Sequence, residues 1–524
     1  MAGFYDAGIE ALHTATRSAL ALLRPERPDR LLRGLIAGAI AGPTAAGLLA
    51  MAAARYPTAV ALDDVDGELS YAALWRRTDS LAADLRDRGV GEEDTVGVLA
   101  RNGRTFVVAW LAAARLGCDV VFLNTGFAAP QLADVIRGEQ ITVLLHADEF
   151  AGVVGAAPVA HILSGSDIED SGSRRGRMPS LPSRRRGAAV ILTSGTTGRP
   201  KGARRTGTRG GASVAGLLAR IPIRARDTVV IAAPVFHGWG MGHLTIDLAL
   251  SATIVVRARF DPEETVALVA ARRAAGLVVV PVMLQRILEL GPAVLDRYDT
   301  SSLRYIASSG SALGPALVTA TLERFGPVLY NMYGTTEVSM ATIATPLDLI
   351  AHPATAGRPI TGSTVRVLDE AGIEAPRGRR GRIFVGSAAR MDGYTGGGTK
   401  PTVGDLLDTG DVGVIDDDGL LFVEGRSDDM IVSGGENVFP SEVEDLLAHH
   451  PAIRDVVVIG VHDDAFGQRL RAIVVRAPGH RLTAAQVKDH VRANLARHKV
   501  PATVGFVTEL PRNASGKILR NQLT

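Results

Sequence analysis

One stretch of the sequence, Thr193-Ser-Gly-Thr-Thr-Gly-Arg-Pro-Lys-Gly202, decides how the rest of the chain is interpreted. It follows an apolar run from Ala188 that predicts a buried strand. Glycines let the backbone approach an anion closely, while hydroxyls and a lysine supply hydrogen-bond donors and positive charge. The stretch therefore predicts a loop that holds phosphate groups. It differs from the common P-loop, because Pro200 and Gly202 flank the lysine where that loop has Gly and Ser or Thr.

Lysine is rare in this chain, which makes the lysine of that stretch informative. Only five of the 57 basic residues are lysines, namely Lys201, Lys400, Lys488, Lys499 and Lys517, and the others are arginines. Lysine is a compact point charge on a flexible stem, whereas arginine is a planar fork. A lysine among so many arginines is therefore expected where arginine cannot replace it.

The composition bounds the class of protein. A chain of 524 residues is expected to hold about two to four domains. Its 46% hydrophobic and 21% charged residues supply a large core and exclude wholesale disorder. The net charge of +2 does not indicate a nucleic-acid-binding protein. The single cysteine, Cys118, excludes a disulfide framework and a cysteine-based zinc site, and it indicates a reducing compartment and a buried thiol.

Helical patterns alternate with short apolar runs on both sides of the phosphate-binding stretch. This alternation is typical of layered, mostly parallel sheets covered by helices. Strands are predicted at 95–99, 120–123, 142–145, 188–193, 228–232, 276–280, 303–307 and 328–332, and helices at 70–87 and 105–116. Residues 161–187, which are rich in Ser, Gly, Pro and Arg, are predicted to form a mobile loop or linker.

The pattern changes at about Gly362 to short strands separated by Asp and Gly turns. The predicted fold class is a large N-terminal α/β domain, with mostly parallel sheets and a small β-barrel-like subdomain, followed by a separate small α+β C-terminal domain. The predicted parts are a helical extension at 1–55, the large domain at 56–427 with subdomains at 56–187, 188–361 and 362–427, and a mobile C-terminal domain at 428–524. Within the last two parts, strands are predicted at 363–368, 381–385, 420–423, 456–459 and 471–475, and helices at 441–449 and 484–496.

The N-terminal extension contains two features that concern membranes. Gly34 to Ala54 carries no charge, but it is mostly Ala and Gly with Pro43 in its middle, so it is too weakly apolar to favour a spanning helix. A stripe with helical spacing precedes it, formed by Ile9, Leu12, Ala15, Ala19 and Leu22. The stripe is explained either by packing on the protein or by contact with a membrane surface. A peripheral membrane contact through residues 1–54 is therefore one expectation.

Further motifs follow the phosphate-binding stretch along the chain. They are Pro234-Val-Phe-His-Gly-Trp-Gly240, Tyr333-Gly-Thr-Thr-Glu337, Thr409-Gly-Asp411, Gly425-Arg-Ser-Asp-Asp-Met-Ile431, Gly434-Gly-Glu-Asn437 and Pro511-Arg-Asn-Ala-Ser-Gly-Lys517. Together with TSGTTGRPKG, they resemble the signature motifs of the adenylate-forming superfamily, which includes acyl-CoA synthetases, luciferases and peptide-synthetase adenylation domains. The resemblance runs from Thr193 to Lys517, and the region from about Tyr56 fits the family's N-terminal part.

The resemblance implies a set of catalytic residues. In this superfamily a carboxylate attacks the α-phosphate of ATP and pyrophosphate leaves, which requires cationic and metal charge at the reacting groups. Lys517 would bridge the two anions, Thr336 would bond the α-phosphate, and Glu337 would ligate Mg²⁺. A slender ammonium fits between two anions where an arginine fork does not, which agrees with a lysine at position 517.

The resemblance also implies where nucleotide and thiol bind. Asp411 would accept hydrogen bonds from the ribose hydroxyls with support from Arg426, and Tyr333 would stack on adenine. The other implied positions are Thr193, Ser194, Gly195, Thr196, Thr197 and Lys201 at the β- and γ-phosphates, Ser311, Ala312, Asn331 and Gly334 around the nucleotide, and Gly434 and Gly435 in the loop presented to the pantetheine thiol of coenzyme A. Asp428 matches the hinge at which the small domain reorients between two half-reactions.

His237 is implied to lie beside the acyl pocket, although a lone histidine is commonly a packed or capping residue. Amino-acid-activating relatives carry an Asp at this position, so the Phe-His-Gly-Trp sequence favours an uncharged, apolar acid. Gly238, Gly240 and Gly242 either leave room for an acyl chain or serve close packing. The expected enzyme is an AMP-forming acid–thiol ligase that activates a medium- to long-chain fatty acid as acyl-AMP and transfers the acyl group to coenzyme A. In this respect it resembles actinobacterial fatty-acyl-CoA ligases.

Several alternatives remain open. The acid is aryl or branched in one, and in another an acyl-AMP ligase loads a carrier protein. A luciferase-like oxygenase and a catalytically inactive ATP-binding module are weaker, because Lys517, Glu337, Thr336 and Asp411 are all present. Expected partners are the acid, ATP, Mg²⁺ and coenzyme A in the cytoplasm, without nucleic acid. The segment before Lys517 also resembles the recognition site of protein acetyltransferases, and acetylation there would remove the charge.

Overall fold

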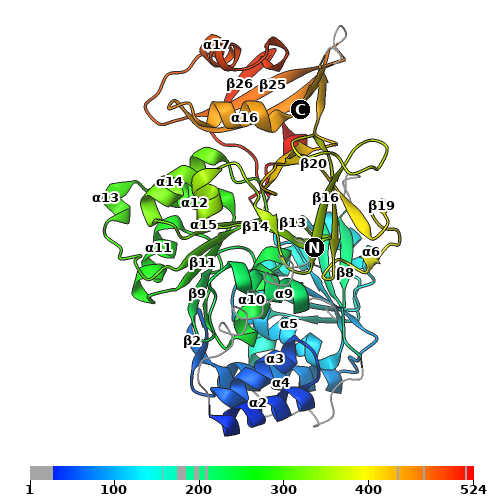
Figure 1. Ribbon diagram of the computed structural model, residues 1–524. Coiled ribbons are helices and arrows are strands. Elements are labelled where there is room, and N and C mark those ends of the chain that lie inside the picture. Colours follow the sequence, from blue (N-terminus) through cyan, green and yellow to red (C-terminus); the bar gives the residue numbers. More distant parts are fainter. Residues whose placement is uncertain are drawn as a thin grey trace, which may run out of the picture. The chain divides into compact units, whose positions relative to one another are not determined.

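The computed structural model describes residues 27–155, 157–173, 185–193, 200–206, 211–433, 436–463, 467–513 and 516–523 (Figure 1). The chain divides into two compact units. Unit 1 comprises Met1–Ala307, Thr335–Ser339 and Ala388–Thr399, and unit 2 comprises Ser308–Gly334, Met340–Ser387 and Lys400–Thr524. The boundaries predicted from the sequence, with a division at residue 427, stay a prediction.

Unit 1 is an alternation of strands and helices. Its elements in chain order are α2 (Pro28–Ala41), α3 (Ala45–Arg55), β1 (Val60–Asp64), β2 (Gly67–Ser70), α4 (Tyr71–Asp87), β3 (Thr95–Leu99), α5 (Arg104–Leu116), β4 (Asp119–Phe122), α6 (Ala129–Gly138), β5 (Val143–His146), η1 (Asp148–Phe150), α7 (Ala151–Val154), β6 (His161–Leu163), α8 (Gly165–Ser173), β7 (Ala189–Thr193), β8 (Lys201–Arg205), α9 (Gly211–Arg220), β9 (Thr228–Ile231), α10 (Gly238–Ala249), β10 (Thr253–Val255), α11 (Pro262–Ala271), β11 (Gly276–Val279), α12 (Pro281–Leu288), α13 (Pro292–Leu295), β12 (Tyr305–Ser308) and β18 (Gly393–Tyr394).

Two sheets organise unit 1. One has the strand order β18-β8-β7-β4-β3-β5-β6, in which β7, β4, β3, β5 and β6 are parallel and β8 folds back antiparallel to β7. The other contains β2-β1-β10-β9-β11, in which β1, β10, β9 and β11 are parallel. Their apolar side chains are buried on both faces, as expected of parallel strands covered by helices. The predicted α/β class is confirmed. Cys118 is buried as predicted, and burial raises the pKa of its thiol to about 12.

The prediction of a loop over 161–187 is wrong for the first part of that range. β6 pairs with β5 in parallel, and α8 follows it. Ser164 begins this helix, because its backbone N–H donates to the Asp167 carboxylate at 2.9 Å and its hydroxyl accepts from the Asp167 N–H at 3.2 Å. Leu163 and Ile168 are buried, and their burial outweighs the polar composition of the segment.

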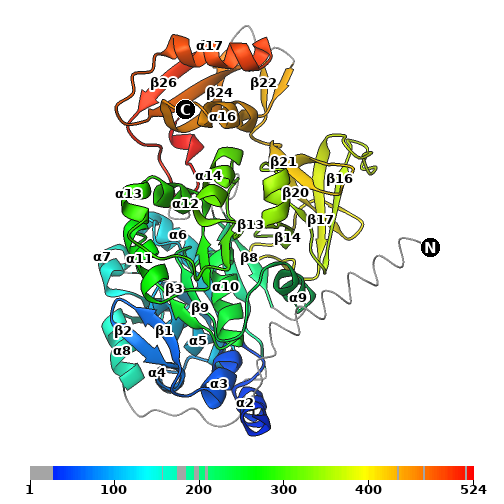
Figure 2. The same cartoon turned by 60° about the vertical axis from the view of Figure 1, so that its left-hand side comes forward.

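α2 and α3 form a helical pair that is broken at Pro43, inside the uncharged segment from Gly34 to Ala54. They pack closely, because a Cβ on Gly38 would lie 2.5 Å from Cγ of Met51. α3 continues into the core of unit 1, where it contacts α4, α5 and α10. Figure 1 and Figure 2 show α2 beside α3. Within the described residues, no helix is both long and apolar enough to cross a membrane.

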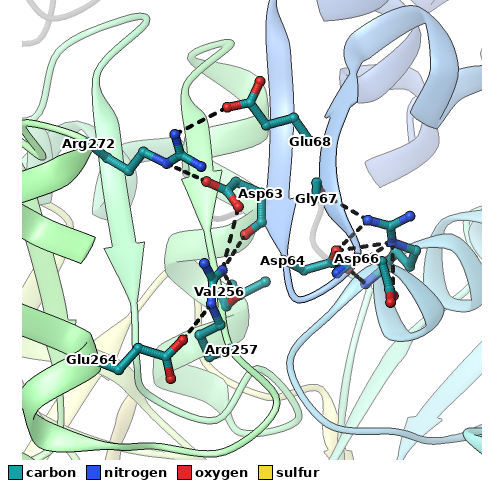
Figure 3. Close-up of polar contacts among 10 residues, drawn as sticks. Asp63, Asp64, Asp66, Gly67, Glu68, Val256, Arg257, Glu264 and Arg272 are labelled. Atoms are coloured by element: carbon teal, nitrogen blue, oxygen red, sulfur yellow. Dashed lines mark hydrogen bonds and ion pairs between the residues drawn. The ribbon is translucent and has the colours of Figure 1, made fainter. Parts of the chain in front are cut away.

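Buried ion pairs fix the carboxyl end of β1. The Asp64 carboxylate accepts the Arg104 backbone N–H at 2.8 Å and its guanidinium Nη2 at 2.5 Å, so it caps α5 and neutralises the arginine. Next to it, Asp63 accepts the Nε of Arg272 at 2.7 Å and lies 3.5 Å from Nη1 of Arg257. Figure 3 shows Arg257 and Arg272 converging on Asp63. Asp64 thus joins β1 to helix α5 of the first sheet, and Asp63 joins it to Arg257 and Arg272, which lie beside other elements of the second sheet.

Unit 2 is richer in antiparallel strands. Its elements are α14 (Pro315–Phe325), β13 (Leu329–Thr335), β14 (Ser339–Ala344), α15 (Pro346–Ala351), β15 (Arg358–Pro359), β16 (Ser363–Leu368), β17 (Gly381–Ser387), β19 (Thr402–Val403), β20 (Leu406–Ile415), β21 (Leu421–Arg426), β22 (Ile431–Ser433), β23 (Glu436–Val438), α16 (Pro440–Ala448), β24 (Ile453–Asp463), β25 (Gly467–Arg476), α17 (Ala484–Asn494), η2 (Arg497–Lys499), β26 (Thr503–Val507) and η3 (Arg520–Gln522). The predicted β-rich subdomain is present as an antiparallel sheet with the order β16-β17-β20-β19, to which β21 pairs on β20.

The C-terminal α+β region of unit 2 has a sheet of β23-β22-β25-β24 with β26 parallel to β25. Successive side chains of its strands point to opposite faces of the sheet, as expected of β-structure. Val456 and Val458 face a cluster that contains Val443 of α16 and Val487 of α17, whereas Val457 belongs to a second cluster on the other face. Both helices therefore cover one face of this sheet (Figure 2).

Candidate active site

The phosphate-binding stretch sits at the end of the β7–β8 hairpin. Thr193 and Lys201 are register partners, and the Thr193 hydroxyl donates to the Lys201 carbonyl at 3.1 Å. The Lys201 ammonium is exposed and lies 5.7 Å from the centre of the Tyr394 ring. The predicted positions Ser194, Gly195, Thr196 and Thr197 lie outside the described residues. Lys201 thus lies where the predicted phosphate-binding loop returns to the hairpin.

Glu337 lies in a turn that the Thr335 hydroxyl stabilises. The backbone N–H groups of Glu337 and Val338 donate to the Thr335 hydroxyl at 3.2 and 3.4 Å. The Tyr394 hydroxyl donates to Glu337 Oε1 at 2.8 Å. Tyr394 comes from β18, which pairs with β8, so residues distant in the sequence orient this carboxylate. The predicted metal ligand is therefore held in one direction by Tyr394, which the motifs did not indicate.

Arg205 is a second residue of this site that the sequence analysis missed. It ends β8, and its guanidinium donates to the Thr336 carbonyl. Burial lowers the pKa of Arg205 to about 10, while the carboxylates of Glu337 and Asp392 act in the opposite direction. An arginine beside the predicted α-phosphate and metal positions adds the positive charge that phosphoryl chemistry requires. In an arginine-rich chain only its position on β8, after the lysine, could have singled it out.

His237 begins α10 without capping it by its side chain. Its Nε2 atom is buried, and among the described residues it has no hydrogen-bond partner. Burial lowers its pKa to about 4, so the ring is neutral near pH 7. Asn102 fixes the preceding loop, because its amide donates to the Ala233 carbonyl at 3.0 Å and accepts the Val235 N–H at 2.9 Å. A capping role for His237 is thereby excluded, and the role beside an acyl group stays a prediction.

α10 carries further polar side chains into the core of unit 1. His243 and Asp247 lie four residues apart on α10, which makes them neighbours on one face, and both are buried. In the part of the chain that the structure describes, neither ring nitrogen of His243 and neither oxygen of Asp247 has a hydrogen-bond partner. The same holds for the hydroxyl of Tyr305, whose pKa is raised by burial and then by the Asp247 carboxylate. Burial raises the pKa of Asp247 well above its usual range and lowers that of His243 to about 3.

The three glycines at the start of α10 differ in their surroundings. A Cβ on Gly240 would lie 2.4 Å from the Pro234 carbonyl oxygen, so this glycine serves close packing. A Cβ on Gly242 would meet no atom within 4 Å, and on Gly238 it would meet only Ile191, at 3.5 Å. Among the described residues, room for a larger group is therefore left beside Gly238 and Gly242 but not beside Gly240.

Unit 2 carries the predicted ribose-binding group. The Tyr333 hydroxyl donates to Asp411 Oδ2 at 2.7 Å, and Nη1 of Arg426 lies 3.6 Å from Asp411 Oδ1. Burial raises the pKa of Asp411, while the hydrogen bond from Tyr333 and the charges of Arg426, Lys517 and Lys400 act against that rise. Burial and the Asp411 carboxylate raise the pKa of Tyr333, so its hydroxyl stays a donor. The structure thus brings Tyr333, Asp411 and Arg426 together.

Arg426 also binds the predicted hinge residue. Its Nε and Nη2 donate to the two oxygens of Asp428 at 2.9 and 3.2 Å, and its Nη1 donates to the Thr409 carbonyl at 3.1 Å. Gly410 has φ +80°, and a Cβ there would lie 3.0 Å from the guanidinium, which explains the glycine of the Thr-Gly-Asp motif. Burial raises the pKa of Asp428, but the bonds from Arg426 outweigh it and lower the pKa below its usual value. The hinge role of Asp428 stays a prediction.

The remaining positions that were predicted to bind the nucleotide differ in exposure and in hydrogen bonding. Ser311 and Ala312 are exposed on the loop after β12. The Asn331 amide donates to the Thr355 carbonyl at 3.2 Å, so its amide group supports the fold beside the predicted pocket. Gly334 lies within β13. Gly434 and Gly435 lie outside the described residues.

Lys517 lies in a tight C-terminal turn. Its backbone N–H donates to the Asn513 side chain at 2.9 Å, and its carbonyl accepts the Asn513 N–H at 2.9 Å. Arg512 supports the turn by donating to the Gly516 carbonyl at 2.8 Å and to Asp455 at 2.7 Å. The Lys517 side chain is exposed, and its charge acts on Asp411. Its catalytic role and its acetylation both stay predictions.

The carboxylates present fit Mg²⁺ better than a metal enclosed by protein ligands. In the described ranges, no cluster of three or more His, Cys, Asp or Glu side chains could hold a metal ion. Mg²⁺ is usually held by one or two carboxylates together with substrate phosphates and water. Glu337, oriented by the Tyr394 hydroxyl, is such a carboxylate.

Comparison with known proteins agrees with this geometry. A family model described as AMP-binding enzyme matches residues 49–395, and one for the AMP-binding enzyme C-terminal domain matches residues 442–517. The chain is 32% identical over 477 residues to a feruloyl-CoA synthase from Amycolatopsis sp, a match that covers 89% of this chain and 96% of the relative. It is 30% identical over 488 residues to an indoleacetate–CoA ligase from Aromatoleum aromaticum, with coverage of 89% and 95%.

A solved structure gives the same result. The crystal structure of an anthranilate CoA ligase in complex with anthranoyl-AMP aligns with a TM-score of 0.83 and 26% identity, over 92% of this chain and 96% of that chain. All three proteins are named as coenzyme A ligases or synthases, and each name refers to an acid with an aromatic ring.

Proposed function

Because the chain belongs to the family of AMP-binding enzymes, we propose that it is an AMP-forming acid–CoA ligase whose acid is an aryl acid with a polar ring substituent. The first half of this proposal is supported by Lys201 and Glu337 in unit 1 and, separately, by Tyr333, Asp411 and Lys517 in unit 2. The second half is carried by the unpartnered polar side chains of α10.

In the first half-reaction, a carboxylate oxygen of the acid attacks the α-phosphorus of ATP. The new acyl–O–P bond forms as the bond to the bridging oxygen breaks, and pyrophosphate leaves with that electron pair. The Lys517 ammonium would lie between the two anions, and Lys201 and Arg205 would offset the charge of the phosphates. Mg²⁺ held at Glu337 would neutralise further phosphate charge. Tyr333 and Asp411 would orient the nucleoside, because Asp411 presents a buried acceptor to the ribose hydroxyls.

In the second half-reaction, the sulfur of coenzyme A attacks the carbonyl carbon of the acyl-AMP. The thioester forms, AMP leaves, and the thiol proton passes to solvent or to a base. His237 is neutral near pH 7 and has a buried Nε2 without a partner in the described chain, so it is able to accept a hydrogen bond from the acid or the thiol.

Helix α10 supports the choice of acid. A buried polar group without a partner costs free energy, on the order of 1–3 kcal/mol, unless a ligand supplies the hydrogen bond. A site of this kind favours a ligand with a matching donor or acceptor over its plain hydrocarbon analogue. His243 and Asp247 supply such groups on α10, the helix that also carries Gly238 and Gly242, and Tyr305 supplies one on β12. A long alkyl chain would satisfy none of them.

The medium- to long-chain fatty acid expected from the sequence is therefore the weaker candidate. It depended on the absence of an Asp in the Phe-His-Gly-Trp motif, and that absence excludes only a cationic amino acid. The relatives reported above are named for acids with aromatic rings, namely ferulate, indoleacetate and anthranilate. These names match the aryl alternative better than an unbranched alkyl chain.

The test is a panel of acids assayed for pyrophosphate release and, with coenzyme A, for AMP and acyl-CoA. The panel holds a hydroxylated arylpropenoic acid, the same acid without the hydroxyl, and straight-chain acids from short to long. We expect the hydroxylated acid to have the highest kcat/KM, about tenfold or more above its unsubstituted analogue. The Lys517→Ala variant supplies the background and is expected to lose pyrophosphate release by about 10²–10³.

Two variants separate the parts of the proposal. Asp247→Leu is expected to lower the preference for the hydroxylated acid without abolishing the reaction, while Thr245→Ser, at a half-buried position of the same helix, serves as the matched control. A dodecanoate kcat/KM above that of every aryl acid would overturn the choice of acid. Acyl-AMP formation without any acyl-CoA would instead overturn the ligation to coenzyme A.

A further inference from the structure

Helix α2 has an outward face of large apolar side chains. Leu31, Leu32, Leu35, Ile36 and Ile40 are exposed by 44, 60, 61, 51 and 43%. Elsewhere in the described chain, exposed Leu, Ile and Val residues are scattered, and α15 carries two of them. An isolated exposed apolar residue needs no explanation, but a contiguous group of this kind marks an interaction site.

The opposite face of α2 is made of small residues. Gly34, Gly38 and Ala41 are the buried residues of the helix. A Cβ on Gly34 would lie 2.8 Å from the Arg55 side chain, and one on Gly38 would lie 2.5 Å from Met51. The glycines therefore let α2 lie close to α3, because a larger residue at either position would force the side chain of Arg55 or Met51 to move. The usual arrangement of a surface helix, with large apolar residues inward, is reversed.

Positive charge borders this apolar face at its N-terminal end. Arg27, Arg30 and Arg33 stand against a single acidic residue, Asp29, between residues 27 and 41, a net charge of +2. Asp29 binds both Arg27, at 3.0 Å, and Arg33, at 2.7 Å, so the arginines form a cluster. Both arginine side chains remain mostly exposed.

We propose that the outward face of α2 docks on an anionic membrane surface, with the five apolar side chains in the interfacial region and the arginines at the lipid phosphates. Leucine and isoleucine on one side with arginines at the border are the features of helices that lie in the plane of a membrane. The helix spans about 21 Å, at 1.5 Å per residue. A second copy of the chain is a poorer occupant, because one short helix supplies less than the ~800 Å² per partner of a standard interface.

This proposal is independent of the proposed function, because it concerns the association of the protein with a membrane and not its reaction. It falls within the sequence-based expectation of a peripheral membrane contact through residues 1–54, but it rests on α2 and not on the stripe at residues 9–22. That stripe lies outside the described residues, and the docking face identified here is formed by α2.

The test is co-sedimentation of the full chain with vesicles of phosphatidylcholine alone and of phosphatidylcholine with phosphatidylglycerol. We expect binding to the anionic vesicles that weakens as salt is added. The triple variant Leu32→Gln, Leu35→Gln, Ile36→Gln should bind at least tenfold more weakly. Arg27→Gln should weaken binding roughly fivefold. The matched control, Leu347→Gln with Ile350→Gln on α15, removes exposed apolar residues elsewhere and should bind like the unchanged chain.

A label gives a second measurement. Cys118 is the only natural cysteine and is buried, so Leu35→Cys can be labelled selectively with a polarity-sensitive dye. Its emission should shift to the blue on anionic vesicles, and that of a label at Leu347→Cys should not. Three results would overturn the proposal. They are no vesicle binding by the full chain, equal binding by the triple variant, or loss of self-association in the triple variant without any change in vesicle binding.

Discussion

Two buried aspartates in unit 1 differ in whether they have hydrogen-bond partners among the described residues. Asp64, at the end of β1, is 4% exposed and accepts hydrogen bonds from the backbone and guanidinium of Arg104. Asp247, in the middle of α10, is fully buried, and no partner for it occurs among the described residues. Burial raises the pKa of both carboxyls, but the bonds from Arg104 outweigh it at Asp64 and leave that pKa lowered, whereas that of Asp247 stays raised.

The difference indicates where the fold uses polar groups for stability and where it holds them for another purpose. A buried charge is retained without loss only when its partners are built into the fold. Asp64 meets that condition through the connection that Figure 3 shows beside Asp63. Asp247 does not, and a residue with an unmet hydrogen-bonding demand in an enzyme core is expected to serve a ligand.

Breaking the paired site should have the largest effect. Asp64→Ala leaves Arg104 buried without its counter-charge, so the free energy of unfolding should fall by about 3–5 kcal/mol in urea titrations. Asp66→Ala is the matched control, because Asp66 is mostly exposed and lies 3.5 Å from the same guanidinium. It should change stability by less than ~1 kcal/mol. Equal losses in the two variants would mean that burial of Asp64 does not matter.

Replacing the unpaired carboxyl should have the opposite sign. Leucine branches at the same position as aspartate, so Asp247→Leu removes the polar atoms with little change in shape. The free energy of unfolding should rise by about 1–3 kcal/mol, the penalty of an unsatisfied buried group. Urea titration of the apo protein measures this rise. A loss of stability would show that Asp247 has an internal partner, and the comparison with Asp64 would then fail.

The two aspartates should also give opposite pH dependences. At Asp64 the folded pKa lies below the ordinary value of 3.8, so its stabilisation is present above that pH and is lost as pH falls through the folded pKa. At Asp247 the folded pKa lies above 3.8, so stability is lost as pH rises from 3.8 to the folded pKa. The gain from Asp247→Leu should therefore grow with pH, by at most ~1.4 kcal/mol per unit. Unfolding measured from about pH 2 to 8 tests both signs, because the Asp64 effect falls below pH 3.8 and the Asp247 effect above it.

The smallest effect extends the comparison to Asp411 in unit 2. This carboxyl has a raised pKa, like Asp247, yet it accepts a hydrogen bond from Tyr333. Tyr333→Phe removes that one bond and keeps the ring, so KM for ATP should rise by about 5–10-fold, which corresponds to ~1 kcal/mol. KM for the acid should stay unchanged. A rise in the KM for the acid instead would place Tyr333 at the acid rather than at the nucleotide.

Much of the fold was predictable from the sequence because its signals are local. Strand β3 follows from the apolar run Thr95–Leu99, and the end of β7 follows from the phosphate-binding stretch. Residues of a motif lie next to one another in the chain, so Thr409, Gly410 and Asp411 needed no tertiary information to be grouped. The short helix α8 was missed, because burial of its Ile168 and the cap at Ser164 stabilise it despite its polar composition.

The sequence by itself therefore determined the family and the α/β order of most elements, and it predicted the residues of the nucleotide chemistry, since motifs and the spacing of apolar positions depend on neighbouring residues. Only the tertiary structure decided which side chains complete the site. Tyr394 and Arg205 reach Glu337 and Thr336 because β18 pairs with β8, more than 180 residues away. Likewise, only packing against α3 turns the large residues of α2 outward, and only burial shows that Asp247 has no partner among the described residues, because pairing and exposure are set by contacts between segments far apart in the chain.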